Sequence, residues 1–403
     1  MTPREHQLQL LEIIDRVHPF DGATGPLPAN LREAYLAIPR HGFVHRYRLL
    51  GETSGFHEIT PENLAGHLPV IYRNVVQTYV DSKGEALPSS NSEPAFILRV
   101  LEQLDLRPGQ RVLEVGSGGG WLSAIMGHAV GPSGKVTGIE IFPELAAQSR
   151  ADLAALGVGN VEIVAGDGGH GWPAGAPFDR VIFTAGSPDL PAVFYDQVRD
   201  GGLLVAPFRN RGGGEDLLVL QKRGSEFVMR AATLAYFVPL TGEKGRGDAD
   251  APQRWDELPL WQELRQHPCA ERKLWFGGPT ASPYELLTGG FRRFLGKLEP
   301  DFVALRSAGA GSPMMPAALV FGLMDEAKRS LALFHPYRLT GYGAPDCFER
   351  CLAIYRLWCE LGMPSTGGLR LVVRRADDRT PAPPGMPVCR GESTFIWSLP
   401  DRG

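Results

Sequence analysis

The segment VLEVGSGGGW, residues 112–121, holds the residue types that could do chemistry most directly. An apolar stretch runs into Gly116, Ser117 and Gly118, two more glycines follow, and a helix-like stretch comes next. Glycines at such a turn adopt positive φ and let a ligand approach the backbone closely. The free N–H groups at the start of the next helix favour an anion or a carboxylate. Either a dinucleotide or S-adenosylmethionine, through its amino-acid end, could bind at this turn.

The spacing of the glycines argues against a dinucleotide. The pattern G-x-G-x-x-G would require glycine at 116, 118 and 121, and position 121 is Trp. A bulky residue therefore stands where close packing of helix on strand needs Gly or Ala.

Two acidic residues end the next two predicted strands. Glu140 lies 24 residues after Gly116, where a carboxylate suits the hydroxyls of a ribose. Asp167, in AGDGG, could accept a hydrogen bond from an adenine amino group, or it could order its own turn. Either acid could instead cap the following helix, a common use of acids at strand ends.

Strands and helices alternate through the segment that would position these residues. The alternation predicts a doubly wound, parallel α/β sheet, whose carboxyl strand ends share the edge where ligands bind. An antiparallel pair, 217–222 and 227–238, would follow the parallel strands. We expect strands over 111–115, 135–140, 161–165, 179–184 and 202–207, with helices over 121–130, 143–156 and 190–198.

Helices are also predicted before this segment. Ser92 would cap a helix over 93–104, and Asn30 would cap a helix that starts near Leu31. The rest of this part is expected to hold a helix over 4–17 and irregular chain over 51–94, with an extended piece over 69–80.

The length of the chain predicts two domains, with one or three as alternatives. The first spans 1–245, with an N-terminal helical part of about 1–90, and the second spans 246–403. The polar segment TGEKGRGDADAP, 241–252, would link them. The second domain is expected to be α+β, with helices over 317–333 and 346–361 and strands over 369–373 and 393–399.

The composition fits a soluble, core-forming protein of 403 residues, with 43% apolar residues and a formal charge of −4. That charge gives no field to attract nucleic acid or an anionic membrane. The N-terminus lacks the apolar run of a secretory signal. Five cysteines, all in the C-terminal third, predict free thiols without a metal site and a reducing, cytoplasmic compartment.

Over most of residues 31–242 the sequence resembles the protein-L-isoaspartate O-methyltransferase family. Seven pieces match in that family's order, which is far more specific than a glycine turn alone. The resemblance implies a Rossmann-like methyltransferase sheet, S-adenosylmethionine as cofactor, and a peptide with an isoaspartyl carboxylate as substrate. The pieces include AIPRHGFV, similar to the family's Pro-Arg-His-x-Phe-Val signature, SNSEP, similar to its Thr-Ile-Ser-x-Pro segment, the glycine turn, and YFVPLTG.

The resemblance also implies roles for particular residues. Ser92 corresponds to the active-site serine, which would orient the acceptor carboxylate and not act as a covalent nucleophile. The substrate would lie near Arg40, His41, Ser90, Ser92 and Ala185. The cofactor would lie against Glu114, Gly116, Ser117, Gly118, Trp121, Glu140, Ile141, Asp167, Gly168 and Thr184.

Other uses of these residues stay open. Ser92 could be an ordinary helix cap, and Ser89 or Ser90 could supply the important hydroxyl. Arg40 and His41 could form a structural ion pair and hydrogen-bond site.

Two residues depart from the family's pattern. Asn91 replaces an apolar residue, and Glu93 replaces Gln or a small residue. An anionic Glu93 beside a carboxylate site would repel the substrate unless it is paired or turned away.

The resemblance thus predicts methylation of an isoaspartyl or aspartyl carboxylate, either as protein repair or as tailoring of a ribosomally made peptide. The C-terminal extension is similar to domains of peptide-tailoring homologues that help to choose the peptide. The alternative is a non-catalytic adaptor that holds cofactor and isoaspartyl peptide without turnover. A methyltransferase for a small molecule or RNA would lack the PRHGFV and SNSEP matches, and the modest charge also argues against RNA.

Overall fold

The computed structural model describes residues 1–20, 25–52, 55–245, 252–274, 290–306, 320–335 and 338–400. The chain divides into two compact units. Unit 1 comprises residues 1–208 and 217–246, and unit 2 comprises residues 209–216 and 247–403. Unit 2 therefore includes a short piece from the middle of the chain.

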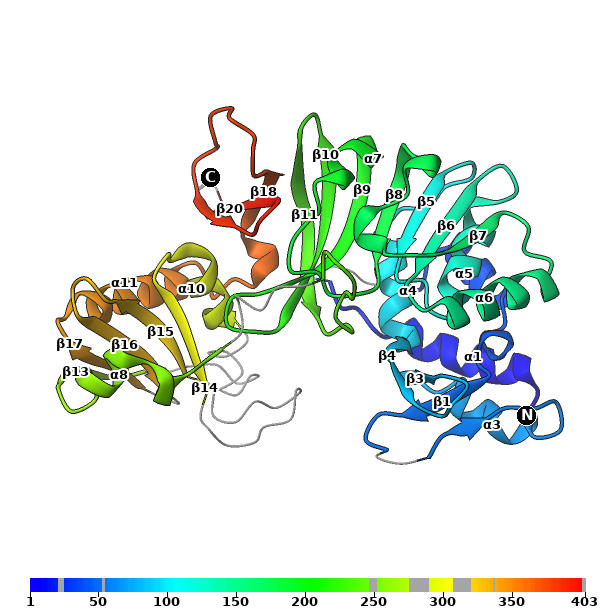
Figure 1. Cartoon of the computed structure of the whole chain (residues 1–403), viewed down its shortest axis with the longest axis horizontal. Coiled ribbons are helices and arrows are strands. Elements are labelled where there is room, and N and C mark those ends of the chain that lie inside the picture. Colours follow the sequence, from blue (N-terminus) through cyan, green and yellow to red (C-terminus); the bar gives the residue numbers. More distant parts are fainter. Residues whose placement is uncertain are drawn as a thin grey trace. The chain divides into compact units, whose positions relative to one another are not determined.

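The large sheet of unit 1 is built from β5 (Arg111–Val115), β6 (Lys135–Glu140), β7 (Val161–Ala165), β8 (Phe178–Phe183), β9 (Val198–Arg209), β10 (Glu215–Arg223) and β11 (Glu226–Ala235). The strand order in this unit is β11-β10-β9-β8-β5-β6-β7 (Figure 1). Strands β5 to β9 are parallel. All six residues of β8 are buried, as expected for a central parallel strand covered on both faces.

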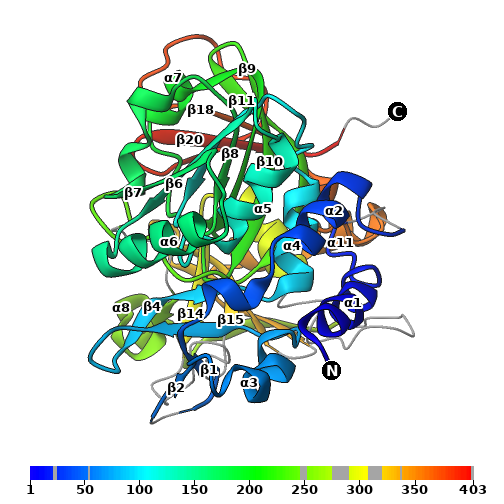
Figure 2. The same ribbon diagram turned by 90° about the vertical axis from the view of Figure 1, so that its right-hand side faces the viewer.

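Helices cover this sheet and form the N-terminal part of unit 1. Helix α5 (Trp121–Val130) packs against β6, and α6 (Pro143–Ala155) packs against β6 and β7 (Figure 2). The other helical segments of unit 1 are α1 (Pro3–Ile14), α2 (Ala29–Ala37), η1 (Arg40–Phe43), α3 (Leu64–Ile71), α4 (Pro94–Glu102), η2 (Gly168–His170), η3 (Pro173–Gly175) and α7 (Val193–Gln197).

A second, small sheet of unit 1 comprises β1 (Arg46–Leu49), β2 (His57–Glu58), β3 (Gln77–Val80) and β4 (Ala86–Asn91). Its order is β2-β1-β3-β4, and all its pairs are antiparallel. Strand β4 pairs with β3 through Ser90 and Asn91, and the register shifts opposite Tyr79. The end of β4 leads directly to Ser92 and helix α4.

Unit 2 contains a six-stranded sheet of order β12-β14-β15-β16-β17-β13, with helix α11 (Asp346–Glu360) packed on β15, β16 and β17 (Figure 1). Strands β18 (Arg370–Arg375) and β19 (Met386–Cys389) both pair antiparallel with β20 (Ser393–Ser398). The remaining elements are β12 (Gln253–Arg254), η4 (Trp255–Glu257), α8 (Pro259–Leu264), β13 (Pro268–Lys273), α10 (Arg292–Leu298), β14 (Phe302–Arg306), β15 (Val320–Asp325), β16 (Ser330–His335), β17 (Arg338–Gly343) and η6 (Thr366–Gly368).

The tip between β9 and β10 joins unit 2 through a buried ion cluster. Asp216 Oδ2 accepts from Lys297 Nζ at 2.6 Å and from Thr366 Oγ1 at 3.0 Å. Arg293 Nε lies 3.2 Å from Asp216 Oδ1. Burial opposes the charge of Asp216, but Lys297 and Arg293 hold its pKa below the usual range. The negative charge of Asp216 is therefore compensated by Lys297 and Arg293, and burying any of these charges without its partners would cost several kcal/mol.

Most predicted elements of unit 1 are confirmed within a few residues, and the α/β fold class is confirmed. The helical prediction over 317–333 is wrong from residue 320 onward, because this segment forms β15 and β16; residues 317–319 lie outside the described ranges. Both strands are buried on both faces, so they lack the alternation that marks a strand in sequence. The helix over 346–361 and the strands near 369–373 and 393–399 are confirmed.

Two predicted helix caps are wrong. Helix α2 begins at Ala29, and the Asn30 amide instead donates to the carbonyl of Leu106 at 3.0 Å. Helix α4 begins at Pro94 with Glu93 as its N-cap residue, so Ser92 lies outside the helix.

The chain before α4 is more ordered than predicted. The prediction of irregular chain over 51–94 is wrong, because this segment holds β2, α3, β3 and β4. The extended piece expected over 69–80 is divided, because Pro69 lies inside α3 and the strand starts at Gln77. All five cysteines are free, and Cys347 and Cys351 are buried. Across the part of the chain that the structure describes, no helix is long and apolar enough to cross a membrane.

Candidate active site

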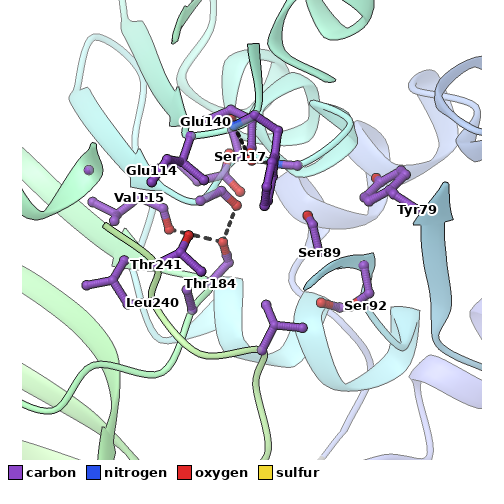
Figure 3. Close-up of a pocket in the computed structure, with 18 of the residues that line it drawn as sticks. Tyr79, Ser89, Ser92, Glu114, Val115, Ser117, Glu140, Thr184, Leu240 and Thr241 are labelled. Carbon is purple, nitrogen blue, oxygen red and sulfur yellow. Dashed lines mark hydrogen bonds between the residues drawn. The ribbon is translucent and has the colours of Figure 1, made fainter. Parts of the chain in front are cut away.

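A pocket with about 740 Å³ of empty space lies at the carboxyl edge of the large sheet. Parallel strands end on the same edge, so the residues after β5, β6 and β8 meet there. The end of β4 and the extended segment 238–241 close the pocket from other sides. In Figure 3, Ser89 and Ser92 lie on one side of this space, and Glu114, Glu140 and Thr184 lie on the other.

The turn after β5 keeps its backbone open toward the pocket. Gly116 has φ +90° and Gly118 has φ +54°, a region that side-chain-bearing residues rarely adopt. A Cβ on Gly116 would stand 3.0 Å from the Oγ1 of Thr184, and one on Gly118 would stand 3.2 Å from the ring of Tyr79. The N–H of Gly119 donates to the Tyr79 hydroxyl at 3.0 Å, which anchors the turn to β3.

Glu140 is fixed by backbone donors at the end of β6. Its Oε2 accepts from Gly118 N–H at 2.7 Å and its Oε1 from Phe142 N–H at 3.0 Å. Burial raises the pKa of Glu140, and these N–H groups act in the opposite direction. The Ile141 N–H is a third donor to this carboxylate. A carboxylate has about four acceptor sites, so Glu140 can still accept from a ligand hydroxyl.

Glu114 is a second carboxyl at the base of the pocket. It is 1% exposed, and its Oε2 accepts from the Ser123 hydroxyl. Burial raises the pKa of Glu114 to about 8, although the Ser123 hydrogen bond lowers it. This carboxyl therefore holds its proton at neutral pH.

Ser92 follows β4 and lines the pocket. Its hydroxyl has no hydrogen-bond partner among the described residues. It does not cap α4, because the Asn74 side chain does that by accepting from Ala95 N–H at 2.8 Å. The hydroxyl is therefore available to a ligand.

Glu93 does not line the pocket. Its carboxylate accepts from the Asn74 amide at 2.5 Å. The same Asn74 side chain thus holds Glu93 and caps the first turn of α4. The neutral Asn74 amide does not cancel the charge of Glu93, but it holds the carboxylate at a residue that does not line the pocket.

The pocket brings together most of the residues that the sequence singles out. Twelve of them line it: Ser90, Ser92, Glu114, Gly116, Ser117, Gly118, Trp121, Glu140, Ile141, Gly168, Thr184 and Ala185.

Three predicted site residues do not line the pocket. The Asp167 carboxylate accepts from Gly169 N–H at 2.9 Å and Glu243 N–H at 2.7 Å, so it orders the turns around it. His41 shares a 2.7 Å hydrogen bond with the Tyr72 hydroxyl, and burial lowers the pKa of His41. Arg40 is fully buried behind the end of β4.

Sequence reasoning missed several residues of the wall. Tyr79 carries no sequence signal, because only the fold brings β3 against the glycine turn. Phe142 follows Glu140 directly and could have been inferred from that position. The segment 238–241 lies within YFVPLTG, which the family resemblance already marked.

The pocket can orient two reactants, but it supplies no general base and no nucleophile. Among the residues that line it there is no His, Lys, Arg or Cys. Ser92, Ser89 and Ser90 line the same pocket as Glu114, Glu140 and the glycine turn. A reaction whose nucleophile is already ionised fits such a site, because it needs no general base.

Comparison with known proteins agrees with this geometry. The family model described as protein-L-isoaspartate(D-aspartate) O-methyltransferase matches residues 68–245. Protein-L-isoaspartate O-methyltransferase of Methanopyrus kandleri is 36% identical over 54% of this chain and 85% of its own length. Protein-L-isoaspartate O-methyltransferase 2 of Archaeoglobus fulgidus is 39% identical over 54% of this chain and 88% of its own.

A solved structure titled protein-L-isoaspartate O-methyltransferase extends the likeness of fold. It superposes with a TM-score of 0.51 at 20% identity and covers 96% of this chain and 98% of its own. The covered share therefore includes most of unit 2.

Proposed function

The chain belongs to the protein-L-isoaspartate(D-aspartate) O-methyltransferase family, and from this premise we propose that it methylates the side-chain carboxylate of an isoaspartyl residue in a protein or peptide. The methyl donor is S-adenosylmethionine. One observation carries the proposal: a single pocket holds the open glycine turn and Glu140 on one side and the unpartnered Ser92 hydroxyl on the other.

The residues present fit this cofactor. The buried Ser117 hydroxyl has no partner among the described residues, so it can serve a ligand at the turn. Gly116 and Gly118 line the pocket, so their backbone can be approached by the amino-acid moiety of the cofactor. Glu140 can still accept from a ribose hydroxyl. These four residues would hold the cofactor.

The chemistry that S-adenosylmethionine supplies when bound is a methyl group on a positively charged sulfur. The acceptor carboxylate has an ordinary pKa of about 4 and is ionised near pH 7. An oxygen–carbon bond forms, the carbon–sulfur bond breaks, and no proton moves. The pocket without His, Lys or Cys supports this reaction, since no base or nucleophile is required.

Ser92 supplies a hydrogen-bond donor for the acceptor carboxylate. A fixed donor holds one carboxylate oxygen and aims the other at the methyl group. The positive charge of the donor sulfur and the negative charge of the carboxylate both disappear during the transfer. Water would stabilise the charged reactants more than the transition state and so slow the reaction. Apolar residues of the wall, Ile97, Leu122 and Leu240, support a dry site.

We propose further that unit 2 selects the acceptor, which is the step that separates repair from peptide tailoring. Most of unit 2 follows residue 245, where the family match ends, which supports a function for unit 2 in addition to methyl transfer. The five free cysteines support a reducing, cytoplasmic compartment. The altered SNSEP segment, with Asn91 and Glu93, was the reason to consider a non-catalytic adaptor, and the hydrogen bond that holds Glu93 at Asn74, outside the pocket lining, favours the enzyme.

Two peptides that differ only in an isoaspartyl or aspartyl linkage test the function. We expect methyl ester, or methanol after its hydrolysis, from the isoaspartyl peptide. Ser92→Ala should lower kcat roughly 10- to 100-fold and leave the calorimetric affinity for S-adenosylmethionine unchanged. Cofactor binding without methylation of either peptide would favour the adaptor, and methylation of the aspartyl twin alone would favour tailoring.

A further inference from the structure

Arg40 is a fully buried cation at the back of the acceptor side. It lies on η1, and its side chain is 0% exposed. Its Nη2 donates to the carbonyl of Ser92 at 3.1 Å and to that of Asn91 at 3.3 Å. Its guanidinium carbon lies 5.3 Å from the centre of the Trp121 ring, and Trp121 lines the pocket. Arg40 therefore holds the backbone that carries the Ser92 hydroxyl.

No carboxylate balances this charge. Among the described residues, Arg40 forms no ion pair, and its Nε and Nη1 have no hydrogen-bond partner. The titratable groups that influence it are the phenols of Tyr35, Tyr72 and Tyr79. Burial lowers the pKa of Arg40 to about 10, so it remains a cation at neutral pH.

The neighbouring polar groups do not supply the missing negative charge. Gln77 and Asn91 lie opposite each other on β3 and β4. Gln77 Oε1 and Asn91 Nδ2 are buried and also without partners. With the two atoms of Arg40, this makes three donors and one acceptor. The cluster is short of acceptors and carries a net positive charge.

Arg99 shows how the same unit buries an arginine that needs no ligand. Arg99 is 1% exposed, and its Nη1 pairs with Glu102 at 3.0 Å. Its other nitrogens donate to the carbonyls of Ile14 and Gly25. A buried charge without such a partner is expensive, so the unbalanced charge of Arg40 points to a negative group that arrives from outside.

We propose that Arg40 is the positioning and charge-selecting residue of the acceptor site: it fixes the carbonyls of Asn91 and Ser92, and its charge is balanced by the carboxylate that binds at the Ser92 hydroxyl. This inference rests on the proposed function and adds the reason for its preference for an anionic acceptor. Arg40 acts through Ser92 and does not touch the acceptor.

The positive charge of Arg40 acts differently on the substrate and on the product of the reaction. The acceptor is an anion before transfer and a neutral ester afterwards. An attraction exerted by Arg40 therefore strengthens the binding of the substrate and fades for the product. Because it acts on the ground state, its loss should appear in the acceptor KM more than in kcat.

The test compares an isoaspartyl peptide with its neutral amide twin, which carries isoasparagine. Affinities are measured by calorimetry in the presence of S-adenosylhomocysteine, so that no turnover occurs. We expect the wild type to prefer the anion by about tenfold or more. Arg40→Met should bring this ratio close to one, and Arg40→Lys should retain most of it.

Arg99→Met is the matched control, since it removes a buried arginine from the same unit. It should lower stability but keep the preference for the anion. Arg40→Gln, which is neutral but still a donor, decides the matter if Arg40→Met does not fold, and cofactor affinity reports folding in each case. A neutral variant at Arg40 that keeps the wild-type ratio would overturn the inference. A wild type that fails to methylate the isoaspartyl peptide would instead overturn the proposed function.

Discussion

At the scale of single residues, the glycine turn depends on positions that have no room for a side chain. Gly118 combines φ +54° with the ring of Tyr79 3.2 Å from where a Cβ would stand. We expect Gly118→Val to abolish S-adenosylmethionine binding in a calorimetric titration, because it adds both strain and a clash.

Gly157→Ala separates these two effects. Gly157 has φ +67°, but nothing lies within 4 Å of a Cβ placed there. This variant should lose about 1 kcal/mol of stability from backbone strain and keep its cofactor affinity. Undiminished binding by the Gly118→Val protein would contradict the placement of the cofactor at the turn.

Glu114 makes stability depend on pH. Its pKa is about 8 in the folded protein, above the ordinary 4.5, because the carboxyl is buried. Between these values the folded state binds a proton that the unfolded state releases, so the free energy of unfolding falls as pH rises. Denaturant unfolding of the cofactor-free protein at about pH 5 and pH 8 should show this loss.

Glu114→Gln removes the titrating group. The free energy of unfolding of this variant should therefore lack the wild-type fall between about pH 5 and pH 8, which is on the order of a few kcal/mol. Glu162→Gln makes the same change at an exposed residue of β7 that pairs with Lys135. It should reproduce the wild-type profile. If the free energy of unfolding depended on pH in the same way for the wild type and the Glu114 variant, Glu114 would not be protonated in the folded protein at neutral pH.

At the scale of elements, the start of α4 depends on one side chain from a loop. Asn74 caps the helix at Ala95 and pairs with Glu93. Asn74→Ala should cost about 1 kcal/mol of stability from the lost cap. It should also raise the KM for the isoaspartyl peptide, because the Glu93 carboxylate is released beside the acceptor site.

The double variant Asn74→Ala, Glu93→Gln distinguishes charge from geometry. If the freed charge is responsible, removing it restores the acceptor KM while the stability loss remains. A KM that stays high in the double variant would mean that the position of Ser92, and not the charge of Glu93, was disturbed. Steady-state kinetics with a fixed, saturating cofactor concentration measures both variants.

The sequence predicts the elements of the large sheet well because each strand is short, apolar and bounded by turn residues. Strands β5, β6 and β7 agree with the predicted bounds to the residue. Strands β15 and β16 were missed because both of their faces are buried, which removes the alternating pattern.

Side-chain roles are predictable only where the partners are local. Glu140 accepts from Phe142 in its own turn and from Gly118 in the turn after the neighbouring strand β5, and its place in the pocket follows from the strand–turn pattern of the sequence. Arg40 binds carbonyls 51 and 52 residues away, and Asp167 binds an N–H 76 residues away. The sequence cannot show such pairs, so it left open whether Arg40 and Asp167 contact a ligand or order the chain around it.

At the scale of the whole molecule, removal of unit 2 is not a simple truncation. Deleting residues 247–403 takes away Lys297, Arg293 and Thr366 and leaves the β9–β10 tip, including Asp216, without partners. We expect the shortened chain to be poorly stable, and to recover when residues 209–216 are replaced by a tight turn such as Asn-Gly.

The repaired short chain should bind S-adenosylmethionine with nearly the affinity of the full chain, because the pocket lies in unit 1. It should also lose the discrimination among acceptor peptides that we assign to unit 2. Competition between the preferred peptide and a scrambled peptide of the same composition measures this. A short chain that discriminates as well as the full chain would give unit 2 another role.

The shared hairpin tip also limits how such a protein can be assembled from parts. Asp216 leaves the ribosome 81 residues before Lys297 and 150 residues before Thr366, so its burial waits for most of the chain to be synthesised. A gene fusion that adds only a C-terminal segment to a shorter relative would deliver a buried lysine with no acid to receive it. Transplanting unit 2 into another scaffold therefore requires two grafts, one at a hairpin and one at the end of the chain.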